Sequence, residues 1–197
     1  MTIATYAQLQ DAVENWTHRA NLGDRVDEFI SLGEARIGRE VKAKQMEQRV
    51  STAPTTNYVS LPSDYVAMRG VRIKGATIGW LDYMTPDEFF ATTASSSSSS
   101  IKKYTIFGDE LAFPVTPSGD VELWYYKRLT VLASAVNTLF TSNPDLYLYA
   151  ALAAAAPFQV SGERLTMFEG LFQQVKESVN AADKHGRYPA GMSMKVV

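Results

Sequence analysis

The sequence predicts an α+β fold, in which about four helices from both ends of the chain form one bundle and the middle forms a small antiparallel β region. In the first and last thirds of the 197 residues, apolar side chains recur at helical spacing. The middle third instead contains short β-branched and aromatic segments separated by Pro, Gly and Ser. We expect one composite domain with N-terminal helices over 1–52, an inserted β region over 53–132, C-terminal helices over 133–187 and an extended tail over 188–197.

The first helix is expected from about Tyr6 to Arg19. Thr5 and Gln8 have the spacing of a capping box, in which each side chain binds the backbone N–H of the other residue. The apolar positions that follow share one helix face, and they are Tyr6, Leu9, Val13 and Trp16.

Asp24 can cap a second helix, whose apolar stripe extends towards Met46. Glu40 and Lys44 are expected to form a favourable i,i+4 pair on it. Its outer face is expected to carry charges of both signs, from Arg25, Glu28, Arg36, Arg39, Glu40, Lys44 and Glu47.

Six strands are expected in the middle: Tyr58 to Leu61, Ala67 to Lys74, Thr77 to Asp82, Tyr104 to Phe107, Glu110 to Phe113, and Val121 to Leu129. Pro86 opens a short helix after Thr85, and Phe89 and Phe90 give that helix apolar side chains to bury. The run Ser95 to Ser100 is predicted to be a flexible surface loop.

Helices return at Asn143, an expected N-cap followed by Pro144, and the alanine-rich helix runs to about Phe158. Ser161 is expected to cap a last helix that ends at Gly186.

The composition excludes several kinds of function. A formal net charge of −2 disfavours a protein that grips DNA through many phosphate contacts. The absence of cysteine excludes disulfides and thiolate sites and suits a reducing cytoplasm, and two histidines leave little basis for a histidine metal site. No apolar run is long enough to span a bilayer, and Met1 to Ala4 shows no basic leader of a secretion signal.

No motif of a known catalytic centre is present, so no enzyme activity, catalytic residue, cofactor or metal is expected. Glu34 and Glu40 resemble an acid and base pair, but Arg and Lys lie near each in the sequence, so a solvated ion-pair face is favoured. His18 and His185 are interpreted as cations at helix C-termini.

Strand alternation should place Trp124 and Tyr126 on one face and Tyr125 on the other, which favours sheet core or a protein interface over a stacking site for sugars or bases. Basic residues on a loop and strand are interpreted as solvated rather than bound to DNA, and they are Lys102, Lys103, Lys127 and Arg128. Small residues at i,i+4 spacing suit close helix packing, within the monomer or between subunits, and they are Ala150, Ala151, Ala154 and Ala155.

Two groups of residues are favoured for a subunit or portal interface. The charged face of the second helix would contribute Arg36, Arg39, Glu40, Lys44 and Glu47, and the apolar tail would contribute Tyr188, Met192, Met194, Val196 and Val197. A loop facing the tail or nozzle would contain Ser95, Ser100, Lys102 and Lys103. Segments of this kind can order when a partner binds.

Several stretches, in this order, resemble the head-to-tail adaptor proteins of tailed phages: Thr5 to Leu9, Phe29 to Glu40, Leu61 to Tyr65, Trp124 to Leu129, and Asn143 to Leu152. The chain looks related to the tail tubular protein A type. That resemblance implies a ring, expected to be a dodecamer, between the portal above and the tail or nozzle below, with double-stranded DNA passing through its bore without specific binding. It also implies a structural virion protein that is made in the host cytoplasm and contacts no membrane.

Two alternatives remain. A tail-associated peptidoglycan hydrolase would need a carboxylate with a raised pKa, and the candidates are Glu34, Glu40 and Glu169. A tail completion or terminator ring would differ only in the neighbour that it binds.

Overall fold

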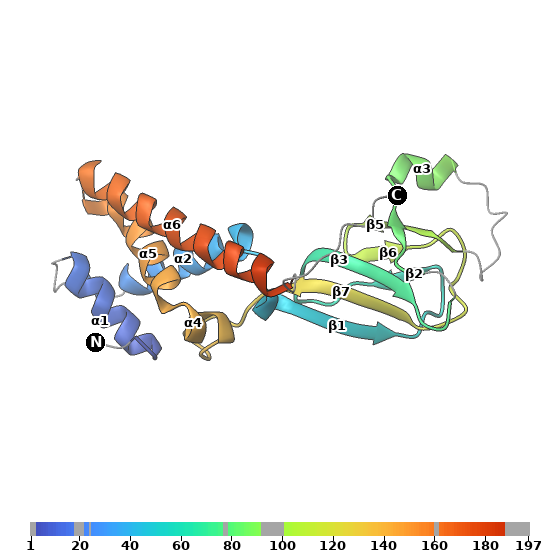
Figure 1. The fold of residues 1–197 in the computed structure, drawn as a ribbon, viewed down its shortest axis with the longest axis horizontal. Coiled ribbons are helices and arrows are strands. Elements are labelled where there is room, and N and C mark those ends of the chain that lie inside the picture. Colours follow the sequence, from blue (N-terminus) through green and yellow to red (C-terminus); the bar gives the residue numbers. More distant parts are fainter. Residues whose placement is uncertain are drawn as a thin grey trace. The chain divides into compact units, whose positions relative to one another are not determined.

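The computed structural model describes residues 3–17, 22–23, 25–76, 79–91, 101–159 and 162–187, without the side chains of 159, 162–165 and 184–187. The chain divides into two compact units. The helical unit comprises Met1–Met46 and Leu129–Val197, and the β unit comprises Glu47–Arg128 (Figure 1). The predicted α+β class, with a β insertion between N- and C-terminal helices, is confirmed.

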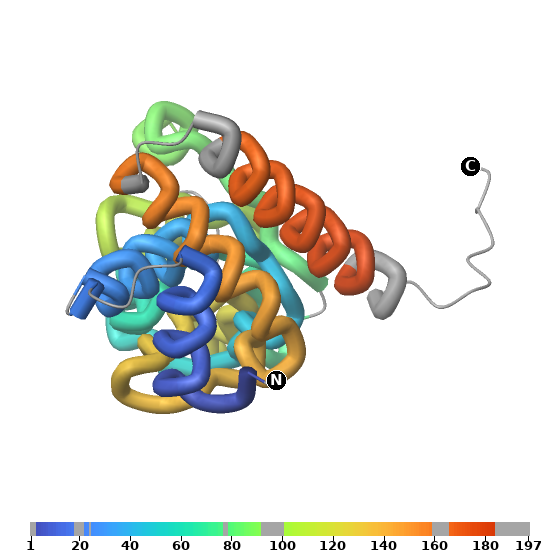
Figure 2. The backbone as a smooth tube through the Cα atoms, turned by 90° about the vertical axis from the view of Figure 1, so that its left-hand side faces the viewer, coloured from blue at the N-terminus to red at the C-terminus, as the bar shows by residue number. Residues whose placement is uncertain are grey.

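The described part of the helical unit contains a helix that the sequence did not predict, because the short α4 precedes the alanine-rich helix. Its elements are α1 (Tyr6–Thr17), α2 (Arg25–Glu40), η1 (Lys44–Met46), α4 (Thr138–Ser142), α5 (Pro144–Ala155), η3 (Ala156–Gln159) and α6 (Gly162–Arg187). Helix α5 contacts α1, α2 and α6, and Figure 2 shows it between α1 and α6. It is apolar on nearly all sides, as expected for a helix surrounded by others.

Helices α2 and α5 approach closely at Gly33. A Cβ atom added there would lie 2.9 Å from the amide nitrogen of Ala151 and 3.0 Å from the carbonyl carbon of Ala150. Only a residue without a side chain leaves room for this contact. The small residues Ala150 and Ala151 therefore serve packing within the chain.

The predicted capping box of α1 is confirmed. The Thr5 amide donates to Gln8 Oε1 over 3.2 Å, and the Gln8 amide donates to Thr5 Oγ1 over 3.3 Å. Asn143 is also the N-cap residue of α5, with Pro144 at the first helical position. Its side chain does not cap that helix; its amide group donates to the Leu139 carbonyl of α4 instead.

The prediction that the second helix extends towards Met46 was wrong, because α2 ends at Glu40. Asp183 of α6 accepts a hydrogen bond from the Lys44 amide over 2.8 Å, and Lys42 Nζ donates to the Gly38 carbonyl near the helix end. These contacts satisfy backbone groups at the point where the chain leaves the helix. Lys44 is consequently outside α2, so the predicted helical pair between Glu40 and Lys44 does not form.

The described residues of the β unit form two small sheets. One has the order β1-β7-β3, formed by β1 (Glu47–Thr52), β7 (Val121–Lys127) and β3 (Tyr65–Ile73). The other has the order β2-β6-β5-β4, formed by β2 (Tyr58–Ser60), β6 (Glu110–Ala112), β5 (Lys103–Phe107) and β4 (Asp82–Tyr83). The pairs are antiparallel as predicted, except that β4 and β5 are parallel.

Two further details of the β unit differ from the sequence prediction. Strand β1 was not predicted, because its residues Glu47 to Thr52 are mostly polar. The segment Thr77 to Asp82 was predicted as a strand, but residues 77 and 78 lie outside the described residues and β4 begins only at Asp82.

The short helix α3 (Pro86–Ala91) forms where predicted, and Thr85 and Glu88 close a capping box at its start. The expectation that Phe90 is buried was wrong, because this side chain is 76% exposed.

Candidate interaction surfaces

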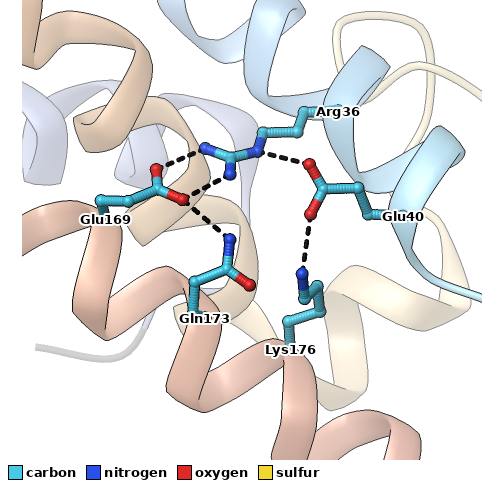
Figure 3. Close-up of polar contacts among 5 residues, drawn as sticks. All are labelled: Arg36, Glu40, Glu169, Gln173 and Lys176. Atoms are coloured by element: carbon cyan, nitrogen blue, oxygen red, sulfur yellow. Dashed lines mark hydrogen bonds and ion pairs between the residues drawn. The ribbon is translucent and has the colours of Figure 1, made fainter.

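Helices α2 and α6 are joined by a network of charged and polar side chains (Figure 3). Arg36 donates to both carboxylate oxygens of Glu169, over 2.7 and 2.6 Å, and to Glu40 over 2.8 Å. Lys176 donates to the other oxygen of Glu40 over 2.8 Å, and Gln173 donates to Glu169 over 2.7 Å. Two cations therefore neutralise two carboxylates between the helices.

The network also changes the acidity of its members. Hydrogen bonding from Arg36 is the main cause that lowers the pKa of Glu169 to about 2. Burial alone would raise the pKa of Glu40, but its hydrogen bonds from Lys176 and Arg36 hold it below its ordinary value. Both carboxylates are therefore ionised at neutral pH.

Three of the predicted interface residues bind partners within their own chain. Arg36 and Glu40 belong to the network between α2 and α6, and Glu47 pairs with Arg69 in the β unit. Arg39 and Lys44 are exposed, and neither side chain has a polar partner in the described part of the chain. Their role at an interface stays a prediction.

The other predicted interface residues are mostly outside the described residues. This applies to Ser95 and Ser100 and to the tail positions Tyr188, Met192, Met194, Val196 and Val197. His18 also lies outside them, and the side chain of His185 is not described. Lys102 and Lys103 are described and exposed, and Lys103 is the first residue of β5.

Glu34 does not belong to the ion-pair face on which the sequence placed it. Its carboxylate is half-buried and accepts a hydrogen bond from the Leu132 amide over 2.8 Å, and burial raises its pKa. The prediction of a solvated ion-pair face was thus right for Glu40 and wrong for Glu34. Glu34 anchors the connection between β7 and α4 to α2 of the same unit.

The three carboxylates proposed for the hydrolase alternative all have partners within the chain, and only Glu34 among them has the raised pKa that this alternative requires. Of its three candidate carboxylates, Glu40 and Glu169 have lowered pKa values and both oxygens bound by donors, and Glu34 serves a backbone amide. Among the described residues, no group of three or more acidic, histidine or cysteine side chains is placed to hold a metal ion.

The described helices include none that is long and apolar enough to cross a membrane.

The face of the β1-β7-β3 sheet that points away from the β-unit core carries a pair of stacked tryptophans. The predicted alternation along β7 is confirmed, because Leu123 and Tyr125 are 1% exposed whereas Trp124 is 36% exposed. Trp80, from the segment after β3, stacks on Trp124 with ring centroids 5.4 Å apart and planes 19° apart. It lies against Gly70, where an added Cβ would come within 2.7 Å of its ring.

Charged side chains surround this tryptophan pair. Glu122 has a side chain that is 8% exposed, and it is bound by Arg72 and Arg49, which hold its pKa below the ordinary value. Arg69 lies over the Trp124 ring at 5.5 Å, and Arg72 lies 5.9 Å from that of Trp80. A hollow of about 150 Å³ is lined by Arg49, Arg72, Trp80, Glu122, Leu123 and Trp124. We call it the Trp–Arg hollow.

The sequence reasoning missed this site. It considered Trp124 and Tyr126 but not Trp80, because the position of Trp80 depends on a contact with Gly70 of another segment. The signal that could have found it is a glycine in the middle of a strand, which often marks the close approach of another group.

Comparison with protein families gives the class of this chain: it is a phage head–tail adaptor. The matching model is that of the SU10 adaptor protein, and the match extends over residues 4–194. Because nearly the whole chain is covered, the chain belongs to the SU10 adaptor protein family, which confirms the resemblance seen in the sequence. Comparison with curated proteins finds no significant match.

Proposed function

We propose that this adaptor assembles with copies of itself into a ring, expected to be a dodecamer, between the portal and the tail or nozzle of a tailed phage. The ring is a structural part of the virion, guides the genome through its bore and provides the platform for tail attachment. The family match over residues 4–194 is the observation that carries this proposal.

The charge of the chain supports the passage of DNA without binding. The formal net charge is −2, and the three arginines around the Trp–Arg hollow are partly neutralised by Glu47 and Glu122. A surface without clustered unpaired cations releases few counterions from DNA and holds it weakly.

We further propose that the role is not enzymatic. Two of the carboxylates that a hydrolase would need are engaged in the network between α2 and α6, and the third binds a backbone amide. The test is cell-wall lysis by the purified protein and by its Glu34→Gln variant. Lysis that disappears in the variant would replace this proposal with the hydrolase alternative.

We propose that assembly depends on the portal, because the apolar residues of the predicted tail over 188–197 can bury their surface only against the portal. Size-exclusion chromatography with light scattering should show monomers or weak association for the protein alone and a ring complex after portal rings are added. A stable ring without portal would contradict the dependence on the portal, and failure to bind portal would contradict the position of the ring. Binding to completed tail tubes instead of portal rings would indicate the terminator alternative.

A further inference from the structure

The β unit has a protruding aromatic residue as well as a hollow. Phe90 of α3 is 76% exposed, more than any other large apolar side chain in the described part of the chain. Its ring lies 5.7 Å from that of Phe89 and 5.5 Å from that of Phe107 on β5. We define Asp87, Phe89, Phe90 and Phe107 as the aromatic knob. These contacts support Phe90 from below and leave most of its ring exposed.

The knob carries negative charge. Asp87 and Phe90 are three residues apart on α3 and so share one helix face. Phe107 is followed by the exposed turn residue Asp109, and the exposed Glu110, the first residue of β6, pairs with Phe107 across the hairpin. An exposed phenyl ring beside several carboxylates would suit a partner site that is aromatic and basic.

The Trp–Arg hollow has the complementary chemistry. Both oxygens of Glu122 are already bound, by Arg49 and Arg72. Each guanidinium has five N–H donors and uses one of them for Glu122. About four donors on each of the two arginines therefore remain for another acceptor. Neither Trp80 nor Trp124 has a hydrogen-bond partner for its indole N–H in the described part of the chain. The hollow therefore offers donors and aromatic surface.

The net charge of the sheet face around the Trp–Arg hollow also suits an acidic partner. Arg49, Arg69 and Arg72 face Glu47 and Glu122, which gives three positive and two negative charges, a net of +1 on a chain of net −2. A single net positive charge is too little to retain a polyanion such as DNA, but it suits a few carboxylates of a protein.

The hollow also has the right size. Its volume is about 150 Å³. A protein cavity of about 150 Å³ accommodates benzene, whereas sites for drug-sized small molecules are typically about 300 Å³ or more. The hollow is thus suited to one aromatic side chain, and tryptophan and arginine are the residue types that dominate such anchor points in interfaces.

We propose that Phe90 of one copy inserts into the Trp–Arg hollow of the next copy, where Asp87 meets the free N–H groups of Arg49 and Arg72. Each copy contributes a different patch to this contact, which is the arrangement from which closed rings are built. The proposal rests on the proposed ring function and identifies the surfaces that join its subunits.

The test is site-specific crosslinking, which the chain permits because it contains no cysteine. Ala91→Cys places a thiol beside Phe90, and Ser51→Cys places one on β1 opposite Glu122, next to the hollow. The two variants are purified separately, mixed, assembled on portal rings and treated with a short bismaleimide. Crosslinked pairs of one Ala91→Cys and one Ser51→Cys chain are expected.

Two controls make the result specific. Adding Phe90→Ala to the first variant or Trp80→Ala to the second should lower the crosslinking yield by at least about tenfold, as removal of an interface anchor does. Replacing Ser51→Cys with Ser60→Cys, an exposed position on β2 of the other sheet, should give no comparable product.

The failures can be told apart. If the unaltered protein does not form rings on the portal, the proposed function fails and this inference fails with it. If it forms rings but the mixed variants do not crosslink, this inference alone is wrong. The same holds if Phe90→Ala and Trp80→Ala leave the ring intact and instead abolish attachment of the tail, because the hollow then binds the tail protein.

Discussion

Arg36 on α2 binds both carboxylate oxygens of Glu169 on α6, 133 residues further along the chain. A bidentate pair of this kind fixes the relative rotation of two helices as well as their distance. The Arg36 guanidinium also lies 4.3 Å from the centre of the Phe172 ring. The pair therefore joins the polar edge of the α2–α6 contact to its apolar core.

Replacing Arg36 should destabilise the helical unit. We expect Arg36→Ala to lower its free energy of unfolding by about 1–2 kcal/mol, because it removes a partly exposed bidentate pair and a cation–π contact. Urea unfolding followed by the helical circular dichroism signal measures this loss. Arg39→Ala is the matched control, because Arg39 is exposed on the same helix, and a change within about 0.5 kcal/mol is expected there. Equal losses in both variants would show that the pair contributes no stability.

Acid should weaken the same contact. The pKa of Glu169 is about 2 in the folded chain against an ordinary value of 4.5. A carboxylate with a lowered folded-state pKa stabilises the fold above its unfolded pKa, and that contribution is lost as the pH falls through the folded pKa. The stability of the helical unit should therefore decrease between about pH 4.5 and about pH 2. Glu169→Gln should reduce this decrease, and identical pH profiles for both proteins would contradict the assignment.

Gly33 and Gly38 of α2 should respond oppositely to alanine. Gly33→Ala places a Cβ against the backbone of α5 and should cost about 1–3 kcal/mol, because neither helix can yield easily. Gly38→Ala meets nothing within 4 Å and should stabilise the helix by about 0.5–1 kcal/mol. Thermal unfolding of both variants checks the signs. A stabilising Gly33→Ala would mean that α2 and α5 are further apart than described.

The tryptophan stack depends on Gly70. A Cβ at this position would lie 2.7 Å from Cε3 of Trp80, so Gly70→Ala should displace that ring and abolish its stacking on Trp124. In a Trp16→Phe background, Trp80 and Trp124 are the remaining tryptophans, and their exciton signal in circular dichroism should disappear. Gly79→Ala, where an added Cβ meets nothing within 4 Å, is the control and should leave the signal unchanged.

The features that the sequence predicted well are local ones. The capping box of Thr5 and Gln8 and the start of α5 at Pro144 each depend on residues within one turn. The alternation around Trp124 depends only on the period of a strand. Family membership was recognised because ordered segments along the whole chain contribute to it.

The features that could not be predicted from the sequence depend on contacts between distant segments. The end of α2 is set by Asp183, 139 residues after Lys44, and the partner of Arg36 is equally remote. Strand β1 has few apolar residues and is held by pairing with β7. Periodicity within a window of the sequence contains no information on such partners, so the polar network and the Trp–Arg hollow became visible only in three dimensions.

The pairing of β1 with β7 has a consequence for the evolution of this chain. Glu47, where the β unit begins, lies opposite Tyr126, two residues before the unit ends at Arg128. An insertion whose two ends are neighbours can be gained, shortened or exchanged without changing the fold of the domain into which it is inserted. Related phages could therefore exchange this module while retaining the same set of helices.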